Sequence, residues 1–322
     1  LLPLTRSMLD LPHPPRLWLL TQDTVDARPD DRLDGLAHAP IWGFGRSIAL
    51  EEPHIWGGLV DLPPSPDMLR TASQVADALT AAESERELAL RDGQFLAPRL
   101  HPADMSLQQP ISIKSDASYL ISGGFGSLGC AIGLWLARQG AGRILLTSRQ
   151  GAQSAAAQEH VKALEDLGTA AETAALEVSD AEALTAQIAE WGQNGPPLRG
   201  VIHAAGIGEV CNLGDLTWPD CADVVAGKAG GAWALHNATA GEDLDFFLGC
   251  GSIAGLWGGQ KQASYAAANA FLDGLAAFRR ARGLCGASLD LGPLSNTGLV
   301  SEETGRELRR MGLEPFPADR LL

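Results

Sequence analysis

Two polar side chains lie four residues apart in the alanine-rich stretch QASYAAANAFLDGL, residues 262–275. Alanine is the strongest helix former and has no reactive group, so the stretch is predicted to be a helix on which Tyr265 and Asn269 share one face. Taken alone, a helical tyrosine is more often a core or boundary residue than a proton donor. A chemical role for this pair therefore depends on what the rest of the chain supplies.

A glycine pattern lies in the stretch YLISGGFGSLGCAIGLWLARQGAGRILLTSRQG, which begins at Tyr119. Gly124, Gly126 and Gly129 form G-x-G-x-x-G between an expected strand and an expected helix, as the dinucleotide-binding fingerprint requires. A backbone without side chains can approach a pyrophosphate, and the start of the helix favours its negative charge. We expect a dinucleotide to be bound here by Gly124, Phe125, Gly126, Ser127, Leu128 and Gly129.

The residues after the next expected strand indicate which dinucleotide this is. Enzymes that use NAD place Asp or Glu there for the ribose 2′-hydroxyl, but this chain has Ser148 and Arg149. A guanidinium can stack on adenine and pair with a 2′-phosphate, which a carboxylate would repel. NADPH is therefore the expected cofactor. The alternative is that Arg149 is only a solvated surface charge.

Two further stretches lie where an open parallel sheet binds ligands, at the carboxyl ends of its strands. In VIHAAGIG, residues 201–208, an apolar strand leads into small residues, so we expect His203, Ala204, Ala205 and Gly206 to lie near the cofactor. His203 by itself is more typical of a structural histidine than of a base. Ser252 ends another apolar run and is expected to face the cofactor; it is not a nucleophile elbow, because G-x-S-x-G is absent.

The composition restricts the class of function. The 322 residues are 45% apolar and 20% charged, with a formal net charge of −15 that disfavours nonspecific binding to nucleic acid or to an anionic membrane. The apolar stretches are too short to span a bilayer, and the five scattered cysteines form no metal or disulfide pattern and are interpreted as small core residues. We therefore expect no bound metal and a cytoplasmic location. The missing initiator methionine and the abrupt end lead us to expect a piece of a longer polypeptide.

The order of the expected elements predicts an α/β protein in two parts. Residues 1–112 combine short strand-like runs with a helical pattern, and they end in HPADMSLQQPISIKSD, residues 101–116, which is polar, contains proline and lacks periodicity. From 113 to 322, strands and helices alternate, which predicts a parallel sheet covered on both faces. The expected fold is a Rossmann-like doubly wound catalytic half, preceded by a truncated Rossmann-like structural half without cofactor.

Together these motifs resemble the short-chain dehydrogenase/reductase superfamily, in which a serine at a strand end precedes a tyrosine by about a dozen residues. The usual motif there is Y-x-x-x-K, whereas this chain has Asn269 in the lysine position. Ketoreductase domains of modular polyketide synthases and of animal-type fatty acid synthases exchange the two residues, and Lys228 in VVAGKAGGAWALHNAT matches the segment that supplies their lysine. The first hundred residues resemble the structural half of the same domains, so the resemblance spans essentially the whole chain.

The resemblance implies NADPH-dependent reduction of a β-ketoacyl thioester on an acyl carrier protein, with other synthase domains flanking this one. Tyr265 would donate a proton to the developing alkoxide and Ser252 a second hydrogen bond. Lys228 would favour the tyrosinate, and Asn269 would orient Lys228 or hold a proton-relay water. These four residues form the catalytic set that the resemblance implies.

Other positions match the family less closely. Glu177 and Val178, in LEVSD, would contact the adenine, although the family often has Asp where Glu177 lies. Residues 291–293, Leu291, Gly292 and Pro293, keep the Gly-Pro of the family's W-G-x-W region but not its tryptophans. A substrate lid is expected over about 297–318.

Two positions bear on stereochemistry through the resemblance. Trp257 lies eight residues before Tyr265, which marks A-type ketoreductases, and residues 207–210 lack the Leu-Asp-Asp mark of the B type. Gln262 replaces the histidine of the A2 subtype, so A1 is expected. An A1 domain makes an L-configured β-hydroxyl and leaves an α-methyl group unepimerised.

Two other functions are compatible with a ketoreductase-like fold. A redox-inactive scaffold or epimerising domain has no physical need for the set Lys228, Ser252, Tyr265 and Asn269. A free-standing reductase of small metabolites would not explain the N-terminal half. An active carrier-dependent reductase is therefore the favoured interpretation.

Overall fold

The computed structural model describes residues 1–64, 67–81, 85–102, 111–208, 210–295, 306, 308–310 and 312–317. The chain divides into two compact units. The first unit comprises residues 1–109, 209–221 and 254–284, and the second comprises 110–208, 222–253 and 285–322. This division by compactness differs from the linear boundary expected at residue 112, and the extent of the functional halves stays a prediction. Within the described ranges, no helix combines the length and apolarity needed to cross a bilayer.

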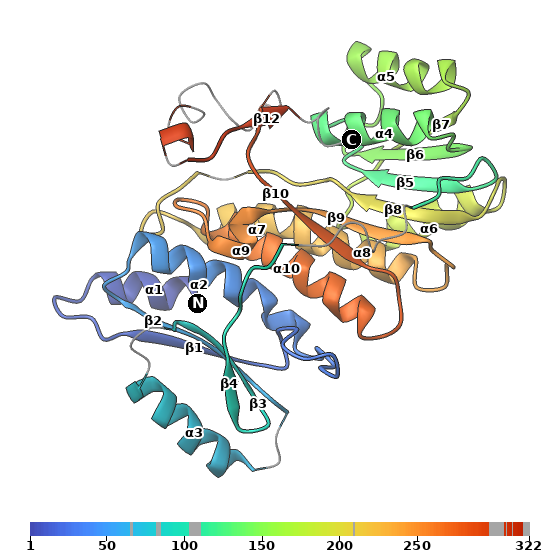
Figure 1. The fold of residues 1–322 in the computed structure, drawn as a ribbon. Helices are drawn as coiled ribbons and strands as arrows, with labels where there is room; N and C mark the ends of the chain where they lie inside the picture. Colours follow the sequence, from blue (N-terminus) through green and yellow to red (C-terminus); the bar gives the residue numbers. More distant parts are fainter. Residues whose placement is uncertain are drawn as a thin grey trace. The chain divides into compact units, whose positions relative to one another are not determined.

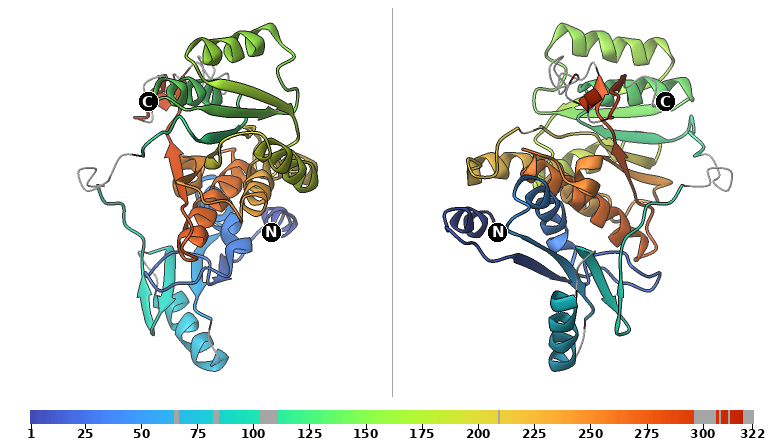
Figure 2. Two further views of the ribbon diagram at one scale, coloured as in Figure 1. Left: turned by 90° about the vertical axis from the view of Figure 1, so that its right-hand side faces the viewer. Right: turned by 60° about the vertical axis from the view of Figure 1, so that its left-hand side comes forward.

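The second unit contains a six-stranded parallel sheet in the order β10-β9-β8-β5-β6-β7. From the central β5 the chain first runs outward to β6 and β7 and then returns to the other side of β5 for β8, β9 and β10. Helices α4 and α5 lie on one face of the sheet, and α6 and α8 lie on the other (Figures 1 and 2). This is the doubly wound α/β fold that the alternation of elements predicts.

The elements of the second unit have the following bounds. The strands are β5 (Ser118–Ser122), β6 (Arg143–Ser148), β7 (Ala170–Ala175), β8 (Leu198–His203), β9 (Phe246–Ser252) and β10 (Ala287–Leu291), with the short pair β11 (Leu294–Ser295) and β12 (Phe316–Pro317). The helices are α4 (Ser127–Arg138), α5 (Ala155–Asp166), α6 (Ala181–Gly192), the π-helix η3 (Ala226–Gly230) and α8 (Gly231–Ala238). Helix α7 (Trp218–Val225) and helix α9 (Ile253–Trp257) cross from one unit to the other. Most of the expected lid, 297–318, lies outside the described residues.

The core of the second unit lies around β5 and β6, whose apolar runs are covered on both faces. Tyr119, Ile121, Ile144 and Leu146 are fully buried there. Tyr119, one of the chain's two tyrosines, stacks on Phe246 and its hydroxyl accepts a hydrogen bond of 2.7 Å from the backbone amide of Lys114. The hydroxyl of Tyr119 therefore has a structural role, and burial raises its pKa.

The first unit contains a four-stranded sheet in the order β1-β2-β3-β4. Strands β1 (Leu17–Gln22), β2 (Trp56–Leu62) and β3 (Glu87–Arg91) are parallel, and β4 (Gln94–Leu96) forms a hairpin with β3. Asp92 and Gly93 between the hairpin strands both have positive φ, of 50° and 78°, as a tight Asp-Gly hairpin turn requires. The helices are α1 (Leu2–Leu9), the 3-10 helix η1 (Leu36–His38), α2 (Ala39–Glu51), α3 (Met68–Ala81) and α10 (Ala263–Arg280).

Helices α2 and α10 pack along each other (Figure 1), which explains the alanines around Tyr265. Ala263, Ala266, Ala267 and Ala270 are buried. A Cβ at Gly43 of α2 would lie 2.1 Å from the carbonyl oxygen of Ala266, so the two backbones approach too closely for larger side chains. The small residues that the sequence shows on both helices therefore hold α10 against α2.

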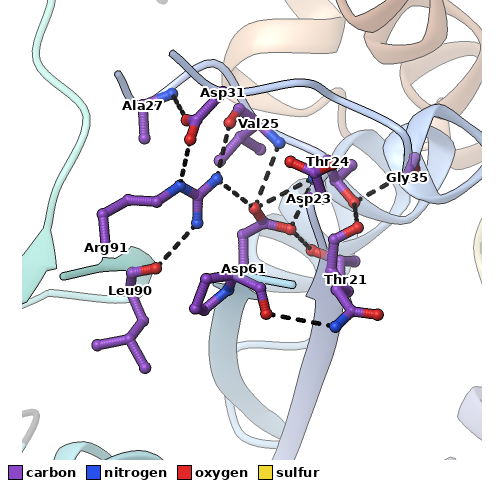
Figure 3. Close-up of polar contacts among 12 residues, drawn as sticks. Thr21, Asp23, Thr24, Val25, Ala27, Asp31, Gly35, Asp61, Leu90 and Arg91 are labelled. Carbon is purple, nitrogen blue, oxygen red and sulfur yellow. Dashed lines mark hydrogen bonds and ion pairs between the residues drawn. The ribbon is translucent and has the colours of Figure 1, made fainter. Parts of the chain in front are cut away.

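A buried polar cluster ties the strand ends of the first unit to the loop that follows β1 (Figure 3). The fully buried carboxylate of Asp61 accepts hydrogen bonds from Thr21 Oγ1 (2.6 Å), from the amide of Thr24 (3.1 Å) and from Arg91 Nη2 (2.8 Å). Arg91 Nε also donates to Asp31 over 2.7 Å. Buried charges require such partners, because an unpaired charge would lose its hydration without compensation.

The cysteine expectation is confirmed only in part. All five cysteines are free; Cys221 and Cys250 are buried, whereas Cys130, Cys211 and Cys285 are partly exposed. The expectation that all five are core residues is wrong for those three, because Cys130 lies in the first turn of α4 and Cys211 and Cys285 lie in segments between helices and strands.

Candidate active site

The glycine fingerprint lies at the turn from β5 into α4, where the sequence places it. A Cβ at Gly129 would lie 2.3 Å from the carbonyl oxygen of Gly123, and one at Gly124 would lie 2.7 Å from Leu146 Cδ2. Gly126 is the N-cap of α4, and no side chain caps that helix. The turn thus requires glycine and presents the first amides of α4, and it suits a dinucleotide pyrophosphate.

The turn after β6 contains the residues expected to choose between NADPH and NADH. Ser148 is the last residue of β6, and its hydroxyl donates to the carbonyl of Gly151 over 3.4 Å. Arg149 follows it and is exposed, as is Glu177 after β7, whereas Val178 is buried. A flexible cation at the end of β6 and the absence of a carboxylate there are compatible with a 2′-phosphate.

His203 ends β8 and is fully buried between two polar groups of the same unit. Its Nδ1 lies 2.7 Å from Ser122 Oγ at the end of β5, and its Nε2 lies 2.8 Å from the backbone oxygen of Lys228. Burial and, secondarily, the positive charge of Lys228 lower the pKa of His203 to about 3. His203 is therefore a neutral structural histidine, as its position at a strand end indicates, and its ring nitrogens contact the protein.

Lys228 lies in the π-helix η3 and is 5% exposed. Its Nζ donates a hydrogen bond of 2.9 Å to the backbone oxygen of Cys250 in β9, two residues before Ser252. A Cβ at Gly206 would lie 2.8 Å from Lys228 Cε, so the small residues after β8 leave room for the lysine. The structure thus fixes a cation next to the strand that ends in Ser252.

Tyr265 and Asn269 lie one turn apart at the start of α10, within the first unit. Tyr265 is partly buried and belongs to the first turn, where the helix dipole favours negative charge. Asn269 is fully buried, and its Nδ2 donates to the backbone oxygen of Tyr265 over 2.7 Å. Among the described residues its Oδ1 has no hydrogen-bond partner, so Asn269 retains an acceptor for a cation or a water.

The expected stereocontrol residues are distributed over both units. Trp257, at the end of α9, is 49% exposed, and Gln262 is the N-cap of α10. In the second unit, Leu291 ends β10 and pairs with Ser252 in the sheet register. Gly292 and Pro293 therefore follow β10 directly beside the end of β9. The catalytic candidates are likewise divided between the units: Tyr265 and Asn269 belong to the first, and Lys228 and Ser252 belong to the second.

Sequence reasoning missed one side chain, Ser122. It ends the apolar run SYLIS and binds the ring of His203 from a distance of 81 residues along the chain. A hydroxyl at the end of a buried strand was a detectable signal, but its partner depends on β5 and β8 being neighbours in the sheet.

Two family models together match most of the chain. Residues 117–296 match the KR domain, and residues 1–100 match the Rossmann fold domain of the polyketide synthase extender module SpnB. Among curated proteins, polyketide synthase GfsA of Streptomyces halstedii is 36% identical over 310 residues, which cover 95% of this chain and 4% of that protein. The chain thus spans only a small part of this relative.

Solved structures give the same result. The ketoreductase from the first module of phoslactomycin biosynthesis in Streptomyces sp. HK803 is 37% identical with a TM-score of 0.89, covering 98% of this chain and 73% of that one. A structure of A-type ketoreductases from a modular polyketide synthase is 37% identical with a TM-score of 0.90, and the match covers 99% of this chain and 68% of that one. A C2-type ketoreductase from a modular polyketide synthase is 31% identical with a TM-score of 0.90, and the match covers 99% of this chain and 69% of that one. The TM-score therefore does not distinguish between the subtypes. The chain belongs to the ketoreductase (KR) domain family of modular polyketide synthases, within the short-chain dehydrogenase/reductase fold.

Proposed function

We propose that this domain uses NADPH to reduce a β-ketoacyl thioester, held on an acyl carrier protein, to an L-β-hydroxyacyl thioester during polyketide chain extension. The observation that carries the proposal is the complete set Lys228, Ser252, Tyr265 and Asn269 in a KR domain, with lysine and asparagine in the exchanged positions. A scaffold or an epimerising domain has no reductive need for this set.

The chemistry requires one hydride and one proton. Bound NADPH supplies the hydride to the ketone carbon, and the oxygen of that carbonyl then develops negative charge. The hydroxyl of Tyr265 transfers its proton to this oxygen, and the hydroxyl of Ser252 donates a hydrogen bond to it. The ammonium group of Lys228 stabilises the tyrosinate that results, and Asn269 offers its Oδ1 to that ammonium group or to a relay water.

The glycine turn supports a dinucleotide cofactor, and the residues after β6 support NADPH over NADH. The glycine turn before α4 fits a pyrophosphate, since a Cβ on Gly129 would collide with the backbone of Gly123. Arg149 is exposed just after β6, and neither position 148 nor position 149 is an acidic residue that would repel a 2′-phosphate. We propose that Arg149 pairs with the 2′-phosphate, and that Glu177 and Val178 contact the adenine.

The proposed stereochemical outcome follows from the resemblance to A1-type domains. Trp257 and Gln262 would select the L-configured alcohol and an unepimerised α-methyl group, with Leu291, Gly292 and Pro293 lining the acyl chain. The half-exposed indole of Trp257 is compatible with a substrate contact. We also propose a lid over about 297–318, a structural half at 1–112, a catalytic half at 113–322, flanking synthase domains and a cytoplasmic location.

The proposal is tested with a racemic 2-methyl-3-oxoacyl N-acetylcysteamine thioester. NADPH oxidation is followed at saturating cofactor, and the product is separated by chiral chromatography. A single L-hydroxy product with an unepimerised methyl group would support the A1 assignment. NADPH binding without oxidation, repeated with the carrier-bound substrate, would instead support the inactive scaffold or epimerising domain.

A further inference from the structure

A chain of three hydrogen bonds runs from the end of β5 through His203 and Lys228 to β9. Ser122 Oγ lies 2.7 Å from His203 Nδ1, His203 Nε2 lies 2.8 Å from the backbone oxygen of Lys228, and Lys228 Nζ lies 2.9 Å from the backbone oxygen of Cys250. All of these residues belong to the second unit. Lys228 is thus held at both its backbone and its ammonium group.

The chemistry of the partners fixes the tautomer of His203. A carbonyl oxygen only accepts hydrogen bonds, so the proton of the neutral ring must be on Nε2, facing Lys228. Nδ1 is then an acceptor, and the hydroxyl of Ser122 donates a hydrogen bond to it. The carbonyl of Lys228 therefore fixes the direction in which the ring of His203 donates, and the hydroxyl of Ser122 holds the opposite side of the ring.

The helix around Lys228 departs from α-helical geometry. Residues Ala226–Gly230 form a π-helix, a rare conformation that is common at functional positions. Gly231, the next residue, lies close to the histidine: a Cβ there would lie 3.0 Å from His203 Cε1 and 2.6 Å from Val178 Cγ1. The absence of a side chain at Gly231 lets the helix approach the ring.

We infer that His203 is a positioning residue for Lys228: its Nε2–H anchors the carbonyl of Lys228 in the π-helix, and Ser122 orients the ring that makes this anchor. The ammonium group then reaches Cys250 from a fixed backbone position. The inference deepens the proposed function, and its link to catalysis rests on that function, but the anchoring of Lys228 can be measured without any activity.

The first test measures how accessible the amine of Lys228 is. Folded wild-type protein is treated briefly with an amine-acetylating reagent, and acetylation of Lys228 is measured by mass spectrometry against the exposed Lys162 and Lys261. In His203→Leu we expect acetylation of Lys228 to rise at least about fivefold, because the buried hydrogen bond that holds the backbone of Lys228 is lost. His236→Leu, which removes another buried histidine of the second unit, is the control for a general loss of stability.

The second test measures the pH profile of kcat per folded enzyme, with the thioester described above. A displaced Lys228 stabilises the tyrosinate less, so in His203→Leu the high-pH limb of kcat should move to higher pH, while kcat falls about tenfold. His203→Gln, which keeps an N–H donor, should restore part of both effects, and Ser122→Ala should show a smaller change in the same direction. Because kcat is expressed per folded enzyme, simple partial unfolding would change neither its value nor the position of the limb.

The two tests separate the two claims. An increase in acetylation at Lys228 in His203→Leu but not in His236→Leu supports the anchor, even if wild-type protein oxidises no NADPH and the proposed function fails. Unchanged acetylation of Lys228 in folded His203→Leu overturns the anchor whatever the activity. With the anchor established, an unchanged pH limb and a kcat within about twofold of wild type overturn its catalytic role.

Discussion

The substitution Gly206→Ala probes the space that Lys228 occupies. The new Cβ would lie 2.8 Å from Lys228 Cε and 3.3 Å from Nζ. Carbon atoms in ordinary contact are about 3.5–4.0 Å apart, so the lysine side chain has to move by roughly 1 Å. Lys228 is 5% exposed and its Nζ bonds to Cys250 over 2.9 Å, so such a movement takes the ammonium group out of hydrogen-bond range.

The expected loss follows from the energy of that hydrogen bond. Hydrogen bonds to charged groups contribute about 1.5–3 kcal/mol. If the position of the ammonium group matters in the transition state, kcat should fall by about ten- to 150-fold, since each 1.36 kcal/mol is a factor of ten. This fall in kcat should persist at saturating NADPH, because the displaced ammonium group affects the proton-transfer step and not only the binding of the cofactor.

The assay is the steady-state reduction of the ketothioester, with NADPH affinity measured separately by fluorescence. Gly227→Ala is the control for an added methyl group beside Lys228, because a Cβ at Gly227 meets nothing within 4 Å. Gly206 also has a φ of 156°, so the free energy of unfolding is measured for both variants and kcat is compared per folded enzyme. A kcat for Gly206→Ala within about twofold of the value for Gly227→Ala would refute the reasoning. It would mean that the lysine moves aside at no cost, or that its position does not affect the reaction.

Three further predictions concern stability and the cofactor. Asp61→Asn leaves Arg91 partly unpaired in a buried site and should lower the free energy of unfolding in urea by about 3–5 kcal/mol, whereas Asp92→Asn, at a side chain that is 79% exposed, should change it by less than about 1 kcal/mol. Similar values for both would contradict the account of the cluster in Figure 3. Burial lowers the pKa of His203 from 6.5 to about 3, so between these values only the unfolded chain binds the proton and stability falls with falling pH, by at most about 1.4 kcal/mol per pH unit. His203→Gln should remove this part of the slope between about pH 6 and pH 4, and parallel slopes for the two proteins would contradict it. Arg149→Ala should raise the KM for NADPH much more than the KM for NADH, and equal increases would exclude pairing with the 2′-phosphate.

The sequence predicts those parts of the candidate site that depend on local spacing. Tyr265 and Asn269 share a helix face because they are four residues apart, and the glycine pattern marks the turn into α4 because that turn leaves no room for a Cβ. Ser252 ends β9, as its place after an apolar run indicates. In each case the information lies within a few residues along the chain.

The remaining features depend on contacts between distant segments. The ring of His203 bonds to Ser122 because β5 and β8 are neighbours in the sheet, and it bonds to the backbone of Lys228, 25 residues further on, because η3 reaches the end of β8. The alanines around Tyr265 are explained by the approach of α2 at Gly43, some 220 residues earlier in the sequence. No local pattern contains these pairings, since they follow from strand order and helix packing.

The most direct test of the proposed reductase is Tyr265→Phe, which removes one hydroxyl and keeps the ring. Reduction of the ketothioester by NADPH is compared in the wild-type and variant proteins, and NADPH binding is measured in both by fluorescence titration. A positioned proton donor contributes about 10²- to 10⁴-fold to the rate, so kcat should fall by that factor while NADPH affinity stays within about threefold. A variant that binds NADPH normally and retains most of its turnover would contradict the assignment of Tyr265 as the proton donor.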